Sequence, residues 1–142
     1  MQITLIPTTD LPRAAQLTFD NMKVYYAQYA PDWDANKVLE ATSSLENFDI
    51  VVQQEVVGVM RLQYEAESCI VRDLQVMSNA QNKGIGRAAL QEAKRLALNA
   101  ELNALSLRVF KISPAVNLYL SDGFIVQSED DRFFNMVKTL IA

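Results

Sequence analysis

The stretch that decides the fold of this chain is residues 74–90, LQVMSNAQNKGIGRAAL, in which a strand, a polar loop and an amphipathic helix follow one another. Gly84 and Gly86 lie in the loop, where the absence of a side chain lets a ligand approach the backbone closely. The free N–H groups at the start of the following helix attract phosphate. Lys83 and Arg87 add positive charge, and the stretch therefore predicts a site for a polyanionic ligand.

Outward from this stretch, apolar periodicity and turn signals predict seven strands and four helices. The predicted strands are Gln2–Ile6, Phe48–Gln53, Val56–Tyr64, Glu67–Val76, Ala104–Phe110, Phe124–Gln127 and Phe133–Thr139. The predicted helices run from Asp10 to Pro31, from Asp34 to Leu45, from Gly86 to Asn99 and from Pro114 to Asp122. The order β-α-α-β-β-β-α-β-α-β-β indicates a single α/β or α+β domain over residues 1–142.

Local signals place two boundaries. Ser113 before Pro114 is typical of a helix N-cap, and Gly123 is typical of the residue that follows a helix. The turn of the first hairpin is expected at Gln54-Glu55, and that of the second at the acidic residues 128–131.

The strand Glu67–Val76 changes the phase of its apolar residues. Cys69 and Val71 alternate in one phase, whereas Leu74 and Val76 alternate in the other. One extra residue in the strand, a β-bulge, would produce this change and free backbone groups inside the sheet. A strand buried on both faces would show the same pattern, so both interpretations stay open.

Composition excludes several classes of site. The chain has 142 residues, no histidine and one cysteine, which excludes Ser-His-Asp and Cys-His triads, internal disulfides and multi-cysteine zinc sites. We therefore expect no metal. No apolar run is long enough for a membrane helix and no signal peptide opens the chain, so a cytoplasmic protein is expected.

Charge is unevenly distributed. The 13 basic and 17 acidic side chains give a net charge of −4, which argues against nucleic-acid binding. Residues 1–80 carry a net −6, whereas residues 81–111 carry a net +4. This basic segment surrounds the glycine loop and indicates an anionic ligand there, although a solvated helix face would look the same.

Two motifs resemble those of the GNAT N-acetyltransferases. Residues 74–86 are similar to the family's acetyl-CoA motif, a strand ending L-x-V, then a short loop and Q/R-x-x-G-x-G/A at the start of a helix. Residues 113–124, SPAVNLYLSDGF, are similar to its later motif, A-x-x-L-Y-x-x-x-G-F. A P-loop is excluded because no Gly-Lys-Ser/Thr follows. A dinucleotide fingerprint fits less well, because seven residues separate Val76 from Gly84 and the next strand ends without an acid.

The resemblance implies a mixed, mostly antiparallel sheet of about seven strands, with a β-bulge and splayed strands, flanked by about four helices. It implies acetyl-CoA as the acetyl donor, attacked directly by an amine in a ternary complex. The backbone of Leu74, Gln75 and Val76 would pair with the pantetheine arm. The pyrophosphate would be held by Gln81, Asn82, Lys83, Gly84, Ile85, Gly86 and Arg87. Tyr119 would be the general acid that protonates the leaving thiolate, since its ordinary pKa is close to that of a thiol.

The acceptor side is less determined. The family places its acceptor pocket beside the first two helices and the final hairpin, where Tyr26, Tyr29 and Trp33 would suit a cationic amine. The alternative is that Tyr25 and Tyr29 are core residues at i, i+4 and that Asp32 and Asp34 are helix caps. Asp73 is a candidate base, with Glu65 and Glu67 as alternatives.

Two departures concern the acceptor and the base. Ile112 stands where the family commonly has Asn, and residues 104–110 carry no acid. The acceptor could be a small amine or a protein amino group, and the chain a monomer or a homodimer. The alternative function is a non-catalytic sensor or partner-binding module that holds acetyl-CoA or CoA.

Overall fold

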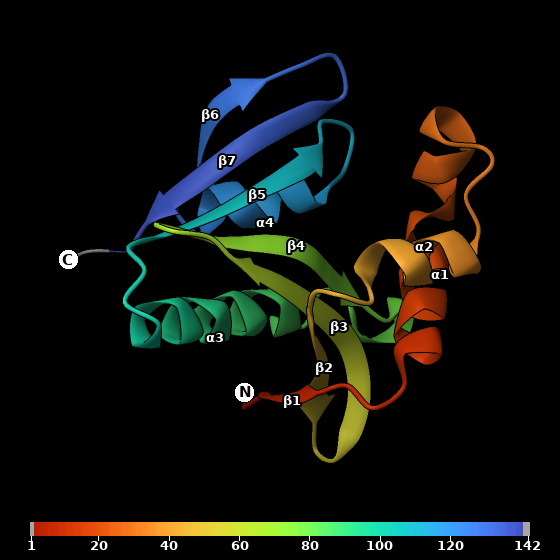
Figure 1. The fold of residues 1–142 in the computed structure, drawn as a ribbon, viewed down its shortest axis with the longest axis horizontal. Helices are drawn as coiled ribbons and strands as arrows, with labels where there is room; N and C mark the ends of the chain where they lie inside the picture. The colour runs from red at the N-terminus through yellow and green to blue at the C-terminus, as the bar shows by residue number, and fades with distance from the viewer. Residues whose placement is uncertain (1, 141–142) are drawn as a thin grey trace. The chain divides into compact units, whose positions relative to one another are not determined.

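A computed structural model describes residues 2–140. Its strands are β1 (Thr4–Pro7), β2 (Glu46–Val52), β3 (Glu55–Tyr64), β4 (Cys69–Val76), β5 (Ala104–Phe110), β6 (Ile125–Glu129) and β7 (Phe133–Thr139). Its α-helices are α1 (Leu11–Tyr29), α2 (Ala35–Thr42), α3 (Ile85–Asn99) and α4 (Ala115–Ser121). The strands form one seven-stranded sheet in the order β1-β2-β3-β4-β5-β7-β6 (Figure 1). The predicted fold class, a mixed and mostly antiparallel sheet with four helices, is confirmed.

The chain divides into two compact units. The first contains residues up to Arg61 together with Asp73–Ala89, and the second contains Leu62–Arg72 together with the residues from Leu90 onward. That the chain forms one acetyltransferase domain stays a prediction.

In the first unit, β1 pairs antiparallel with β2, and α1 and α2 contact each other (Figure 1). Both helices begin at an aspartate whose carboxylate accepts a backbone N–H, from Arg13 at Asp10 and from Lys37 at Asp34. The buried apolar residues of this unit include Ala14, Ala15, Val38, Ile50, Val59 and Met60. Arg61 of β3, where the first stretch of this unit ends, is also fully buried.

In the second unit, β5 pairs parallel with β4 through Cys69–Val71 and antiparallel with β7, which pairs with β6. Helix α4 contacts β5 (Figure 1). The Ser113 hydroxyl accepts the N–H of Ala115 at 3.1 Å, and Gly123 has a φ of +103°. Gly123 therefore follows the helix end as predicted, whereas the N-cap is Pro114, so the predicted N-cap at Ser113 is wrong by one residue.

The first hairpin differs from its prediction. Its turn is formed by Gln53 and Gln54, with φ values of 49° and 70°, and the predicted Gln54-Glu55 is wrong by one residue. Such a turn usually contains Gly, Asn or Asp, and glutamine gives no signal for it.

Other boundaries also shift. Helix α2 ends at Thr42 rather than Leu45, because the Asn47 amide donates to the carbonyls of Thr42 and Leu45 at 2.9 Å each. Strand β4 begins at Cys69 rather than Glu67, since a turn closes from Glu65 N–H to the Ser68 carbonyl at 2.8 Å.

Along β4, buried residues at alternate positions include a polar one, Gln75. Cys69, Val71 and Gln75 are buried, whereas Leu74 and Val76 are half-buried. The apolar phase change therefore arises because glutamine occupies a buried position, and the predicted bulge and splay stay predictions. Among residues 2–140, no helix is long and apolar enough to cross a membrane.

Candidate functional site

The first part of the loop after β4 is anchored by hydrogen bonds at Met77 and Gln81. The Met77 N–H donates to the Val57 carbonyl at 2.8 Å, and a 3₁₀ turn over Ser78–Ala80 follows. The Gln81 amide donates back to the Val76 carbonyl at 3.0 Å. These contacts fix the loop against the end of β4.

The start of α3 has the geometry of an anion site. The Gly84 carbonyl accepts the N–H of Ala88 at 3.0 Å, which makes Gly84 the N-cap residue. The N–H groups of Ile85 and Gly86 then have no acceptor within the helix, and the helix dipole adds partial positive charge. Gly84 has a φ of +83°, and a Cβ built there meets no atom within 4 Å. The backbone is thus open in front of the helix N-terminus.

The predicted phosphate residues gather in this loop. Lys83 is exposed beside the open backbone, and Asn82 has a φ of 62° that reverses the chain before the glycine. Ile85 is buried and holds the first turn of α3 in place. Arg87, one turn further on, is exposed.

The end of β4 is held by a residue that sequence reasoning missed. The Asn21 amide of α1 donates to the Val76 carbonyl at 3.0 Å and to the Gln75 side-chain oxygen at 3.2 Å. Asn21 follows Ala14 and Thr18 at helical spacing, so a polar residue on a buried helix face was the available signal. Gly58 contributes too, because a Cβ there would lie 2.3 Å from the Gln75 carbonyl oxygen.

Asp73, the candidate base, is the ionic partner of Arg61. The Arg61 guanidinium is fully buried and donates to the Asp73 carboxylate at 3.1 Å. It also donates to Asn47 at 2.7 Å and to the Thr18 hydroxyl at 2.8 Å. Sequence reasoning missed Arg61, although an arginine inside the apolar strand 56–62 was a signal. Asp73 therefore has a structural task, and its role as base stays a prediction.

The structure brings two of the three predicted acceptor residues together. The Tyr26 ring lies 5.6 Å from that of Trp33 and 6.0 Å from that of Phe19. Burial raises the pKa of Tyr26 to about 12, and the charge of Asp73 acts in the same direction while Arg61 opposes it. Tyr26 is therefore protonated at neutral pH and can donate a hydrogen bond. Tyr29 lies half-buried on the same helix.

Tyr119, the candidate acid, lies in the second unit. It is buried on α4, and its ring meets the Phe124 ring edge-to-face at 5.7 Å. These contacts fix the position of the ring, and the role of Tyr119 as general acid stays a prediction.

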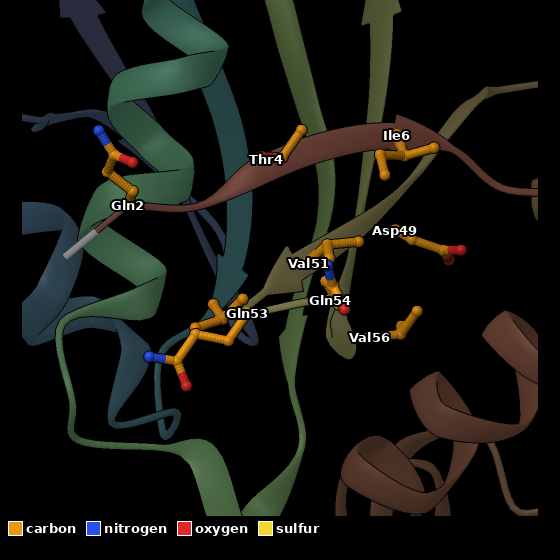
Figure 2. A pocket seen from close by; sticks show the side chains of 9 residues that line it. Gln2, Thr4, Ile6, Asp49, Val51, Gln53, Gln54 and Val56 are labelled. Atoms are coloured by element: carbon orange, nitrogen blue, oxygen red, sulfur yellow. The ribbon is translucent and has the colours of Figure 1, made fainter.

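A separate hollow lies on the first unit. It has a volume of about 1100 Å³ and is lined by residues of β1, β2 and their surroundings: Gln2, Thr4, Ile6, Asp49, Val51, Val52, Gln53, Gln54 and Val56. Figure 2 shows these side chains around it. None of the predicted site residues is among them. Within residues 2–140, no group of three or more potential metal ligands occurs.

Comparison with known proteins gives a consistent result. A family model described as "Acetyltransferase (GNAT) domain" matches residues 46–126, more than half of the chain. No curated protein matches the sequence.

Three solved structures show the same fold. The PaiA N-acetyltransferase of Thermoplasma acidophilum, in complex with coenzyme A, is 18% identical with a TM-score of 0.72, covering 98% of this chain and 99% of that one. A GNAT acetyltransferase of Elizabethkingia anophelis with acetyl-CoA bound is 19% identical with a TM-score of 0.70, covering 96% and 97%. The ribosomal-protein-S18-alanine N-acetyltransferase of Escherichia coli is 21% identical with a TM-score of 0.72, covering 99% and 94%.

The glycine loop at the start of α3 and the Tyr119 segment both lie within the matched residues. The protein therefore belongs to the GNAT family of acetyltransferases.

Proposed function

We propose that the protein transfers the acetyl group of acetyl-CoA to a primary amine. The observation that carries this proposal is the open backbone at Gly84, in front of the N–H groups of Ile85 and Gly86. These groups would bind the pyrophosphate of the donor, with Lys83 and Arg87 adding charge. Two solved structures of the same fold contain coenzyme A or acetyl-CoA, which supports this donor.

The transfer would proceed by direct attack in a ternary complex. The amine nitrogen attacks the thioester carbonyl, the carbon–sulfur bond breaks, and Tyr119 gives its proton to the departing thiolate. The backbone of Leu74, Gln75 and Val76 would align the pantetheine arm, with an N–H near Val76 polarising the thioester oxygen. The proton of the attacking amine would pass to Asp73 or to water.

The acceptor would be a cationic amine held by aromatic rings. The ring centroids of Tyr26 and Trp33 lie 5.6 Å apart, and these rings would supply cation–π contacts to an ammonium group. Tyr29 would extend this surface along α1. A small amine and a protein amino group share this chemistry. A monomer or homodimer, a cytoplasmic location and the lack of nucleic-acid binding stay predictions.

The experiment is a turnover assay combined with calorimetry. The protein is incubated with acetyl-CoA and a panel of polyamines, amino-sugars and lysine-containing peptides, and CoA release is followed for each. We expect CoA binding and at least one acetylated amine. CoA binding without turnover of any amine would support the non-catalytic sensor instead, and absence of CoA binding would refute both.

A further inference from the structure

The C-terminal end of α4 is held by a buried ion pair. The carboxylate of Asp122, whose side chain is only 3% exposed, lies 3.0 Å from the Lys138 ammonium of β7. Its other oxygen accepts the Gln91 amide of α3 at 3.2 Å. A buried carboxylate is stable only when it is paired and hydrogen-bonded in this way. Both contacts hold Asp122, the residue that follows the last turn of α4.

The same turn connects Asp122 to Tyr119 through the backbone. The Tyr119 carbonyl accepts the N–H of Phe124 at 3.0 Å, and the Leu120 carbonyl accepts that of Gly123 at 3.1 Å. With Gly123 at a φ of +103°, these bonds form a Schellman motif. The ring contact between Tyr119 and Phe124 spans the same motif. Tyr119 is thus fixed from two sides, by its ring and by its own carbonyl.

We infer that Asp122, with Lys138 and Gln91, is a positioning residue for the Tyr119 hydroxyl in acetyl transfer. This inference rests on the proposed function, in which Tyr119 gives a proton to the leaving thiolate. A two-turn helix has little stability of its own, so its orientation depends on what holds its ends. The buried pair holds α4 to β7 and α3, and a rotation of the helix would swing the hydroxyl away from the line of proton transfer.

The test is a double-mutant cycle on kcat. Asp122→Asn leaves Lys138 buried without a carboxylate, so the combined variant Asp122→Asn with Lys138→Met is made as well, which removes both charges. We expect kcat to fall by roughly 10- to 100-fold in both, the effect of a small displacement of a catalytic group, with KM for acetyl-CoA nearly unchanged. In a Tyr119→Phe background the combined change should cause no further fall, because the group being positioned is gone. Circular dichroism confirms that each variant is folded.

Glu129→Gln is the matched control, because Glu129 forms an exposed ion pair with Lys111 at 2.7 Å in the same unit and should leave kcat unchanged. An equal loss of kcat with and without the Tyr119 hydroxyl would overturn the positioning role and leave Asp122 purely structural. A rise in KM that accounts for the whole loss would overturn it too. Full kcat in Tyr119→Phe alone would instead refute the acid role on which the inference rests, and no turnover by the wild-type protein would refute the proposed function.

Discussion

Tyr26 and Tyr119 are both packed against other aromatic rings, in different parts of the chain. Tyr26 is packed against Phe19 and Trp33, and its pKa is raised from 10.0 to about 12. Because the folded pKa is higher, its contribution to stability is fully present below pH 10 and is lost as the pH rises through about 12. Tyr26 therefore does not titrate near neutral pH. Tyr119 sits on a short helix, where its ring meets the Phe124 ring at 5.7 Å, and its role as general acid stays a prediction.

Replacing Tyr119 by phenylalanine should lower kcat by roughly 10²–10⁴-fold, the usual range for loss of a general acid. The dissociation constant of CoA should barely change, because the ring that packs against Phe124 remains. The loss should be smaller for an acetyl thioester whose thiol has a lower pKa, since a better leaving group needs less protonation. Steady-state kinetics with both donors measures this. Wild-type kcat, with the chemical step shown to be rate-limiting, would contradict the acid role.

Gly84 tests the phosphate site. Gly84→Asp places a negative charge in the open space before α3 and should abolish CoA binding. Gly84→Asn is its matched control: it has nearly the same shape without the charge, and asparagine tolerates a positive φ better than most residues. We expect calorimetry to detect weakened CoA binding for Gly84→Asn and none for Gly84→Asp. Unchanged CoA affinity in a folded Gly84→Asp protein would refute the assignment of the loop.

At the scale of elements, one buried arginine joins four segments of the first unit. Arg61 of β3 donates to Thr18 of α1, to Asn47 of β2 and to Asp73 of β4. Asn21 of the same helix α1 donates to the end of β4 at Val76. Polar contacts therefore connect the helix that carries Tyr26 with the strand proposed to hold the pantetheine arm.

Removing the charge of Asp73 should destabilise this connection. Asp73→Asn leaves the buried Arg61 guanidinium without its anion, and we expect the free energy of unfolding to fall by about 3 kcal/mol, the lower end for breaking a buried pair, because Asp73 is partly exposed. Asp73→Asn combined with Arg61→Met should restore most of that loss. Urea unfolding of both variants measures it. Wild-type stability in Asp73→Asn would show that the ion pair with Arg61 contributes little to folding. The kcat of folded Asp73→Asn is a separate test of the role of Asp73 as base.

At the scale of the whole chain, the charge split seen in the sequence is partly cancelled by local pairs. Residues 81–111 carry six basic side chains, of which Arg95 pairs with Glu92, Arg108 with Asp130 and Lys111 with Glu129. Arg108 also stacks on the Phe133 ring at 3.7 Å. Three of the six basic side chains of residues 81–111 therefore have an acidic partner nearby, whereas Lys83 lies exposed in the glycine loop.

The remaining asymmetry leads to a prediction about salt. If the acceptor is a cationic amine, its KM should rise with ionic strength, since charges more than about 10 Å apart are screened at 0.1 M salt. The acetylation rate is measured against salt concentration for a polyamine and, as control, for a neutral amine-bearing acceptor. Equal salt dependence of the two, or a screen that returns only neutral or anionic acceptors, would contradict the cationic acceptor.

The sequence by itself determined the features that depend on neighbouring residues. The order of strands and helices follows from apolar periodicity, the end of α4 follows from Gly123, and the open turn before α3 follows from Gly84. Each of these signals is complete within a few residues, so it can be interpreted without knowing the fold.

Only the tertiary structure decided which polar groups meet. Asn21 and Val76 are 55 residues apart, Thr18 and Arg61 are 43, and Gln91 and Asp122 are 31. A hydrogen-bond partner at such a separation leaves no periodic trace, and the buried position that makes Arg61 need Asp73 exists only once the strands have paired. The sequence could therefore indicate a phosphate loop and an acid, whereas the contacts that hold β4 and α4 in place depend on packing between distant segments.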